Sequence, residues 1–365
     1  MIKIAIVTLN GYKNFGNRLQ NYALQETLVK LGFKVETVLT YEKKSNSRKA
    51  YNIKTILKKI RDVTPKYRKF RQIEDLRTKR FKEFSETYIQ ETKEKYYSAE
   101  LSFIADDYEY FVVGSDQVWN PSYISNNSTF FLTFAPKEKR IAYAPSFGAA
   151  SIPDSLKDNY KLWISEMAHL SVREDAGSRI IKELTSRDAE VVVDPTLLVD
   201  KNEWLSISKP HKKKPTEKYL LTYFLGDAYD KQFSKINKIA DKYQLKIINL
   251  ASKNDIERFD ADPGEFIDYI NGSSVFFTDS FHGAIFSILL SKPFIVFDRI
   301  SDLPSMNSRI ETLLRKFNLE NRKWGNVNES SDILDVDFSH VSPLLKKERE
   351  LAFNYLRNAL SVKEE

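Results

Sequence analysis

One histidine stands out because of the residues around it. His282 lies in the stretch Thr-Asp-Ser-Phe-His-Gly, between two strongly apolar runs, and the chain has only four histidines. An imidazole gains and loses a proton near neutral pH, so a histidine at the end of a buried strand is a candidate general acid or base. The alternative is a structural histidine in the core, whose ring nitrogens form hydrogen bonds with other buried groups. Because His282 follows an apolar strand and opens a helix, we expect it to lie in an active site.

Charged residues follow two other expected strands. Asp116 comes soon after the run FVV, and Arg173 comes directly after LSV. A buried carboxylate needs a partner, a cap or a catalytic role, and an arginine can hold a carboxylate or phosphate through two hydrogen bonds. Alternatively, Asp116 caps a helix and Trp119 belongs to the core. For Arg173, an ion pair with a neighbouring acidic residue explains the position equally well. Asp194, in VVVDPT, is expected to end a strand and start a turn.

Two groups of side chains suggest two substrates. Amides, carboxylates and an indole face suit a sugar, although an ordinary strand–helix connection would also explain the residues after the first strand. The acceptor candidates are Asn14, Asn17, Arg18, Gln20, Ser115, Asp116, Gln117, Trp119 and Asn120. Arginines beside a helix N-terminus suit an anionic donor instead. The donor candidates are Arg173, Ser280, Phe281, His282, Gly283, Arg299 and Arg309.

These side chains need strands that end at a common edge. Apolar, β-branched runs alternate with helical periodicity, which is typical of an α/β fold with parallel sheets. The expected strands are 3–8, 34–38, 110–114, 141–144, 170–172, 190–193, 219–225, 246–250, 275–278 and 294–297. The expected helices are 17–31, 156–167, 176–184, 230–243, 263–271, 284–290 and 342–360. A polar linker at 206–218 separates two doubly wound halves, whose ligands would bind beyond the carboxyl ends of the strands.

The composition excludes several classes of chemistry. The chain has 365 residues, enough for two domains, and no cysteine, so disulfides, thiol nucleophiles and cysteine-based metal sites are ruled out. The sequence has no dinucleotide or Walker glycine loop and no nucleophile elbow, and we expect no metal site. No apolar run is long enough to span a bilayer, and the first residues resemble a strand rather than a signal peptide. We therefore expect a cytoplasmic protein.

The positive charge is concentrated in residues 43–95, which hold 18 Lys and Arg against 7 Asp and Glu. Apolar residues recur there with helical spacing, so we expect a helical insertion. A solvated helix with basic outer faces is one interpretation, and contact with an anionic membrane surface or a phosphorylated acceptor is the other. The segment shows no nucleic-acid-binding motif, so we expect no nucleic-acid partner.

Six stretches resemble, in order, the polysaccharide pyruvyl transferase family. They are AIVTLNGYKNFGNRLQNYALQ, FVVGSDQVWN, APSFG, SVREDAG, VVVDPTLLVD and TDSFHGAIFSILLSKP. The resemblance extends over about residues 1–315, and the basic segment 43–95 falls outside it. It implies a GT-B-like fold of two Rossmann-like domains, with the acceptor side in 1–205 and the donor side in 217–340. A last helix within 342–365 would pack back on the first domain.

The resemblance also implies a reaction. Pyruvate would pass from phosphoenolpyruvate to a sugar of a bacterial-type polysaccharide or lipid-linked glycan precursor, forming a pyruvyl ketal without a further cofactor. His282 would protonate the methylene carbon, Arg173 would hold the donor, and Asp116 would assist the attacking hydroxyl. Some members carry an arginine where this chain has Ser280, so Arg299 or Arg309 would substitute for it, or the donor would differ.

Two other functions stay open from the sequence. One is a GT-B glycosyltransferase that uses a nucleotide-sugar donor on the same architecture. The other is a non-catalytic assembly protein associated with glycans or with the inner face of the membrane through residues 43–95. The first predicts stabilisation by a nucleotide-sugar, and the second predicts stabilisation by no donor at all.

Overall fold

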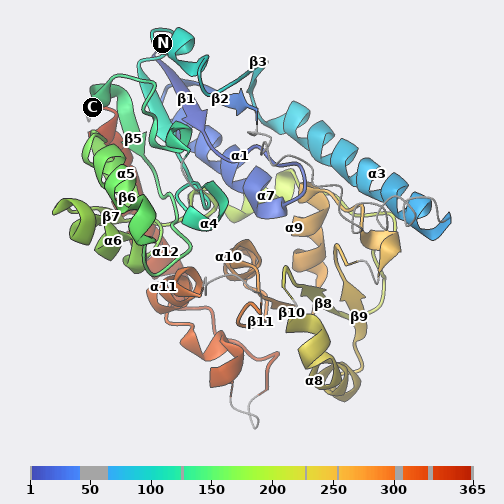
Figure 1. The fold of residues 1–365 in the computed structure, drawn as a ribbon. Helices are drawn as coiled ribbons and strands as arrows, with labels where there is room; N and C mark the ends of the chain where they lie inside the picture. The colour runs from blue at the N-terminus through green and yellow to red at the C-terminus, as the bar shows by residue number, and fades with distance from the viewer. Residues whose placement is uncertain are drawn as a thin grey trace.

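The fold is that of a computed structural model, which describes residues 2–41, 65–124, 127–226, 228–252, 255–300, 307–327 and 332–362. Two parallel sheets with helices packed on them form two halves of the molecule (Figure 1). This is the doubly wound α/β architecture expected from the alternating strand and helix patterns. Each half follows the Rossmann-like plan of a GT-B-like fold, so the carboxyl ends of its strands are where a ligand site is expected.

The first sheet has seven strands in the order β3-β2-β1-β4-β5-β6-β7, and every pair is parallel. The strands are β1 (Lys3–Val7), β2 (Lys34–Thr40), β3 (Glu91–Tyr96), β4 (Tyr110–Val113), β5 (Arg140–Ala142), β6 (His169–Val172) and β7 (Glu190–Val191). The strand order reverses between β1 and β4, which creates a crevice at their carboxyl ends. The segments that follow these two strands therefore lie next to each other.

The second sheet has four parallel strands in the order β11-β10-β8-β9. They are β8 (Tyr219–Tyr223), β9 (Lys246–Asn249), β10 (Val275–Thr278) and β11 (Phe294–Val296). Its strand order reverses between β8 and β10, so a second crevice lies at the carboxyl ends of these strands. The stretch that contains His282 leaves the sheet at this point.

Helices cover both sheets. They are α1 (Phe15–Lys30), α3 (Pro65–Tyr88), α4 (Pro121–Ile124), α5 (Asp154–Ser165), α6 (Asp175–Thr185), α7 (Lys201–Ser206), α8 (Ala228–Lys242), α9 (Pro263–Gly272), α10 (Phe281–Leu290), α11 (Ser308–Lys316) and α12 (Val341–Ala359). Most bounds agree with the sequence periodicity to within three residues. No helix in the described part of the chain is long and apolar enough to cross a membrane.

The basic segment 43–95 differs from the helical insertion that we expected. Residues 43–64 lie outside the described residues, and 65–88 form α3 as the periodicity indicates. Residues 91–96, however, form β3 at the edge of the first sheet, where they pair only with β2. The sequence ETKEKY conceals this strand because an edge strand has little need of apolar side chains and is often protected by charged ones.

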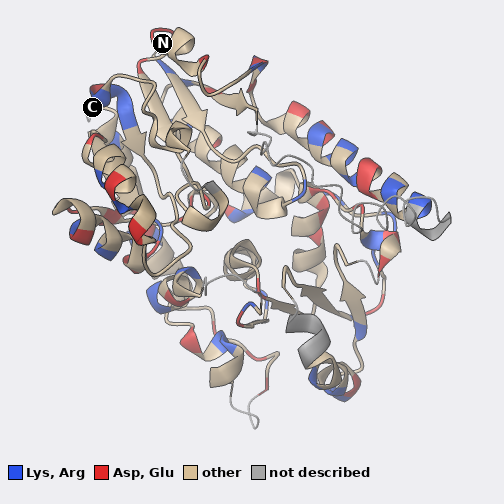
Figure 2. Cartoon of the chain, in the orientation of Figure 1, with Lys and Arg blue, Asp and Glu red and all other residues tan. Residues whose placement is uncertain are grey.

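The helix α3 also belongs to the core more than a solvated helix would. Figure 2 shows basic and acidic residues interspersed along it. Arg77, however, is buried and donates hydrogen bonds to the carbonyl oxygens of Phe259 and Ala261. Arg80 forms ion pairs with Asp260 and Glu265 of the second half. The inner face of α3 therefore holds the two halves together, while its outer face stays exposed.

The last helix returns to the first half. Tyr355 on α12 donates a hydrogen bond from its hydroxyl to the Ala142 carbonyl at 2.7 Å, at the end of β5. Arg349 donates to the Leu197 carbonyl at 2.6 Å and pairs with Asp200 at 2.5 Å. The apolar side of α12 lies in the largest hydrophobic core, which contains residues of both halves. The chain thus crosses between the halves twice.

Candidate active site

The start of α10 fixes the position of His282. Ser280 is the N-cap of this helix, and its hydroxyl accepts a hydrogen bond from the backbone N–H of Gly283 at 3.2 Å. Thr278 holds the preceding turn, since its hydroxyl accepts from the backbone N–H of Ser280 at 3.0 Å and donates to the Tyr223 carbonyl at 2.6 Å. His282 is the second residue of the helix and is 6% exposed. The predicted place of His282, at a strand end and a helix start, is confirmed.

A glycine from the first half faces the imidazole. A Cβ atom on Gly16 would lie 2.0 Å from His282 Nδ1 and 2.3 Å from His282 Cγ. Only glycine leaves room for the ring at this distance. The first turns of α1 and α10 therefore meet at the imidazole, one from each half of the molecule. The N-terminus of a helix carries a partial positive charge, which favours a bound anion nearby.

Asp194 connects the two halves of the site with its two oxygen atoms. Its Oδ1 accepts hydrogen bonds from the backbone N–H and the hydroxyl of Thr196, at 3.0 and 2.7 Å. Its Oδ2 accepts from Arg173 Nη1 at 2.6 Å and from the Ser115 hydroxyl at 3.1 Å. The same Oδ2 lies 3.5 Å from His282 Nε2. Asp194 thus ends a strand and starts a turn, as expected, and also contacts the candidate catalytic residues.

The charges of these groups reinforce one another. Burial would raise the pKa of Asp194, but the positive charges of His282 and Arg173 outweigh it and hold that pKa well below its usual range. Burial would likewise lower the pKa of Arg173, yet Asp194 and Asp116 raise it. The ion pair between Asp194 and Arg173 therefore stays charged over the whole physiological pH range, and it fixes the oxygen that faces the imidazole.

Phe281 lies between two buried arginines. The guanidinium carbon of Arg173 is 4.3 Å from the centre of its ring, and that of Arg309 is 5.7 Å away. Three buried N–H groups have no hydrogen-bond partner among the described residues, namely Nε and Nη2 of Arg173 and Nε of Arg309. Burial, followed by the charges of Arg173 and Arg299, lowers the pKa of Arg309 to about 10. A bound anion would satisfy these donors and offset their charge.

Asp116 lies on the side of the first sheet. It follows β4 in a left-handed backbone conformation, with φ of 63°, and is 8% exposed. Asn17 Nδ2 is 3.4 Å from its Oδ2, and Arg173 Nη2 is 3.6 Å from its Oδ1. Gln20 holds the adjacent backbone, since its Oε1 accepts from the Ser115 N–H at 2.9 Å. A carboxylate beside Arg173 is thus available to accept a proton from a hydroxyl group.

A further carboxylate escaped the sequence analysis. Glu174 is fully buried after β6, and its Oε1 accepts hydrogen bonds from the Ser146 hydroxyl and from the backbone N–H groups of Phe147 and Gly148. Its Oε2 has no partner among the described residues. Glu174 directly follows Arg173, so the rule that singled out residues at strand ends could have included it. The same rule applied to β7 could have included Asp194.

Three of the acceptor candidates lie apart from this site. Trp119 is fully buried, stacks on Phe131 at 5.3 Å and donates its indole N–H to the Phe130 carbonyl at 2.8 Å. Its ring is a core side chain, as the alternative interpretation held, and its faces are not open to a sugar. Asn120 donates from Nδ2 to Gln117 Oε1 at 2.7 Å, and Asn120 Oδ1 accepts from the Ser122 N–H at 2.9 Å, so these three atoms are already engaged.

Other candidates act on the site through their neighbours. Arg18 is fully buried, pairs with Glu91 of β3 at 2.9 Å and donates from Nη2 to the Asn17 Oδ1 at 3.1 Å, which orients the Asn17 amide. Asn14 is exposed and caps α1. Arg299 is held by the Asp279 carbonyl at 3.1 Å. The side chains that converge are Asn17, Ser115, Asp116, Arg173, Asp194, Phe281, His282 and Arg309.

Comparison with protein-family models identifies the chain. The model of polysaccharide pyruvyl transferases matches residues 14–301, which include all of these converging side chains except Arg309. The chain belongs to the polysaccharide pyruvyl transferase family. The resemblance of the six sequence stretches is thereby confirmed, and family membership makes the protein a transferase. A comparison with curated proteins gave no match.

Solved structures resemble this pyruvyl transferase family member only at the level of the fold. A UDP-GlcNAc 2-epimerase from Neisseria meningitidis bound to UDP-GlcNAc is 9% identical, with a TM-score of 0.48 over 98% of this chain and 100% of that one. S. aureus MnaA with UDP is 11% identical, with a TM-score of 0.49 over 100% and 98%. An alpha-glucosyltransferase with UDP is 11% identical, with a TM-score of 0.42 over 98% and 96%.

The contact between Gly16 and His282 leads to a first prediction. Replacing Gly16 by alanine places a methyl group inside the imidazole, so the ring must move, and we expect the transferase rate to fall roughly 10²-fold. Overpacking should lower the free energy of unfolding by about 1–3 kcal/mol. The matched control is Gly11→Ala, since a Cβ at Gly11 meets nothing within 4 Å. Equal rates for the two variants would contradict the contact.

Proposed function

We propose that the protein transfers pyruvate from phosphoenolpyruvate to two hydroxyl groups of one sugar and forms a pyruvyl ketal. The observation that carries this proposal is the set of guanidinium N–H groups on Arg173 and Arg309, beside His282, that have no hydrogen-bond partner in the described part of the chain. Phosphoenolpyruvate carries a carboxylate and a phosphate next to a methylene carbon that must be protonated. Arginines suit the two anionic groups, and an imidazolium suits the carbon.

The arrangement supports a balanced reaction in two steps. His282 donates a proton to the methylene carbon, which becomes a methyl group, and positive charge develops at C2. The first sugar hydroxyl bonds to C2 and gives its proton to Asp116. The C2–O bond to the phosphate then breaks, and the leaving phosphate takes the proton from Asp116. The second hydroxyl closes the ketal, and its proton returns to His282.

Asp194 supports this mechanism without contacting substrate. Its Oδ2 lies 3.5 Å from His282 Nε2, so the carboxylate can orient the imidazole ring. The space beside it is small in this structure: a cavity of about 10 Å³ lies between Asp194, Arg173, Phe281 and Arg309. That volume holds about one water molecule. The donor therefore needs the site to open, and we propose that α10 and α11 move away from the first sheet to admit it.

The proposal is tested by incubating the protein with phosphoenolpyruvate and a panel of galactosides and N-acetylmannosamine glycosides. We expect release of inorganic phosphate and a new methyl singlet of the ketal in the proton NMR spectrum. Thermal stabilisation by a UDP- or GDP-sugar, without stabilisation by phosphoenolpyruvate, would instead support a glycosyltransferase. Stabilisation by no donor of either kind would support the non-catalytic alternative.

Arg309 provides a specific prediction about the donor. The Arg309→Met variant removes a buried cation whose Nε has no partner among the described residues, and we expect the KM for phosphoenolpyruvate to rise at least tenfold. The KM for the acceptor should not change. Arg315→Met is the matched control, because Arg315 lies on the same helix but is 57% exposed and pairs with Asp175. A larger effect at Arg315 than at Arg309 would refute this role.

A further inference from the structure

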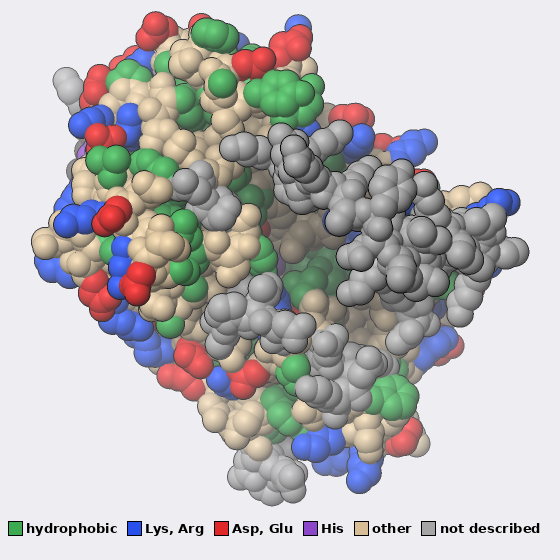
Figure 3. Space-filling view, viewed as in Figure 1, with side chains coloured by type: hydrophobic (Ala, Val, Ile, Leu, Met, Phe, Trp, Pro, Cys, Tyr) green, Lys and Arg blue, Asp and Glu red, His purple; other side chains and the backbone are tan. Residues whose placement is uncertain are grey.

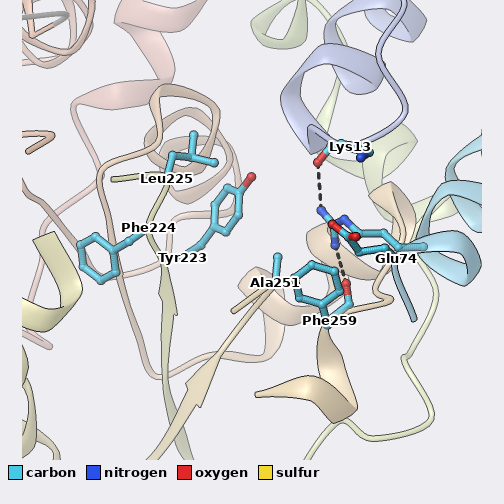
Figure 4. A pocket seen from close by; sticks show the side chains of 8 residues that line it. Lys13, Glu74, Tyr223, Phe224, Leu225, Ala251 and Phe259 are labelled. Atoms are coloured by element: carbon cyan, nitrogen blue, oxygen red, sulfur yellow. Dashed lines mark hydrogen bonds between the residues drawn. The ribbon is translucent and has the colours of Figure 1, made fainter. Parts of the chain in front are cut away.

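A cavity of about 210 Å³ lies between the two halves, away from the catalytic group (Figure 4). Its walls come from the segment after β1, from α3 and from the segments that follow β8 and β9. Figure 4 shows Tyr223 and Leu225 on one side and Lys13, Glu74 and Phe259 on the other. Figure 3 shows a hollow with apolar side chains at its floor in the middle of the same face.

The polar groups of this cavity fall into two kinds. Arg77 is engaged, since it donates to the carbonyl oxygens of Phe259 and Lys13 at 2.7 and 3.1 Å. The side chains of Lys13 and Glu74 and the hydroxyl of Tyr223 have no partner within the described ranges. Burial raises the pKa of Tyr223 to about 12, so its hydroxyl remains a donor at neutral pH. The cavity therefore offers a carboxylate, an ammonium and a phenol between aromatic rings.

The cavity is connected to the catalytic centre through both of its walls. The backbone N–H groups of Leu225 and Gly226 donate to the two oxygens of Asp279, at 2.8 and 2.9 Å, and Asp279 is three residues before His282. On the other side, the Phe15 ring contacts the Tyr223 ring at 5.3 Å. Phe15 directly precedes the glycine that faces the imidazole. A ligand in the cavity thus lies next to both helix starts that hold the catalytic histidine.

We propose that this cavity is an acceptor subsite that binds one neutral pyranose ring of the glycan. The inference rests on the proposed function. The volume is far larger than that of the cavity beside Asp194, which holds about one water molecule, and it suits a single sugar ring. The rings of Tyr223 and Phe259 cover its C–H face, while Glu74 accepts from its hydroxyls and Lys13 and Tyr223 donate to its oxygens.

Helix α3 supplies part of the wall of this subsite. Glu74 and Arg77 both come from α3, whereas His282, Arg173 and Asp116 come from other elements of the fold. A change at Glu74 should therefore alter acceptor binding without altering the groups around His282.

The test measures sugar binding and turnover separately. Saturation-transfer NMR with methyl β-galactopyranoside and methyl N-acetylmannosaminide, in the absence of donor, should give signals for the wild-type chain. We expect Glu74→Gln and Tyr223→Phe to weaken binding of the better ligand about tenfold each. The KM for that acceptor should rise equally, with the KM for phosphoenolpyruvate unchanged. Asp75→Asn is the matched control, because Asp75 is exposed on the same helix and does not line the cavity.

The possible outcomes separate this inference from the proposed function. Binding that depends on Glu74 and Tyr223, without any phosphate release from phosphoenolpyruvate, would support the subsite and contradict the donor. Normal phosphate release with unchanged acceptor binding in both variants would overturn the subsite and leave the reaction standing. Binding of a UDP-sugar that is lost in these variants, with no binding of either methyl glycoside, would also overturn it.

Discussion

Replacing His282 by glutamine is expected to slow phosphate release from phosphoenolpyruvate by roughly 10²–10⁴-fold, the usual contribution of a general acid. Glutamine retains a polar side chain of similar size but cannot deliver a proton. The site geometry should persist, because the cap by Ser280 and the contact between Asp194 and Arg173 do not involve the imidazole. We therefore expect the KM for phosphoenolpyruvate to change much less than kcat.

The control for this result is another histidine. His169 begins β6 on the first sheet, and the His169→Gln variant should retain the wild-type rate. The circular dichroism spectrum of the His282→Gln variant should match that of the wild type, which would show that the slower phosphate release does not come from unfolding. A His282→Gln variant with more than a tenth of the wild-type kcat would exclude His282 as the proton donor.

The second large effect is expected at Asp194. Asparagine keeps the Oδ1 contacts with Thr196 but leaves the buried guanidinium of Arg173 without its closest anion. Removing one partner of a buried ion pair typically costs about 3 kcal/mol or more. We expect the Asp194→Asn variant to lose about this much free energy of unfolding at pH 7, measured by urea denaturation. The rate of phosphate release should fall roughly 10²-fold, because His282 loses its neighbouring charge.

The wild type and the Asp194→Asn variant should differ in free energy of unfolding by an amount that depends on pH, because the pKa of Asp194 is lowered in the folded chain. A carboxyl whose pKa is lower in the folded than in the unfolded chain stabilises the fold fully above the unfolded value, about 3.9. That stabilisation is lost as the pH falls further towards the folded value. The difference in free energy of unfolding between the wild type and the Asp194→Asn variant should hence be constant above about pH 5 and become smaller below about pH 4.

Asp200→Asn is the matched control, since Asp200 also follows β7 and pairs with an arginine, Arg349, but is 71% exposed. Exposed ion pairs contribute at most about 1 kcal/mol. A loss of stability at Asp194 no larger than that at Asp200 would contradict the buried ion pair. A pH-independent gap down to pH 2 would contradict the direction of the Asp194 pKa shift.

The fold was largely predictable because most strands are buried on both faces. Such strands are continuous apolar runs, as in Val275–Thr278, whose predicted and observed bounds coincide. The edge strand β3 was missed for the opposite reason. Lys93, Glu94 and Lys95 are exposed, so it is the pairing with β2 that makes this segment a strand, and that pairing is not visible in its own sequence.

The candidate site was predictable where position alone decides it. His282, Arg173 and Asp116 all follow strands, and the order of the strands brings them together. Trp119 follows the same rule but turns inward, because the direction of a side chain depends on packing that the sequence does not display. The sequence predicts only a turn at Asp194, because a carboxylate before proline commonly caps a turn. The second oxygen of that carboxylate accepts a hydrogen bond from Arg173, which is distant in the sequence, so the residues around Asp194 do not reveal this contact.

The return of α12 to the first half has a consequence for biosynthesis. Ala352 and Leu356 of this helix are fully buried in a core that also contains residues of β1 and α1. The first half of the polypeptide therefore emerges from the ribosome long before the helix that covers part of it. The surface that α12 covers stays open until residues 341–359 have been synthesised. The core of the first half is consequently completed only after the second half has been made.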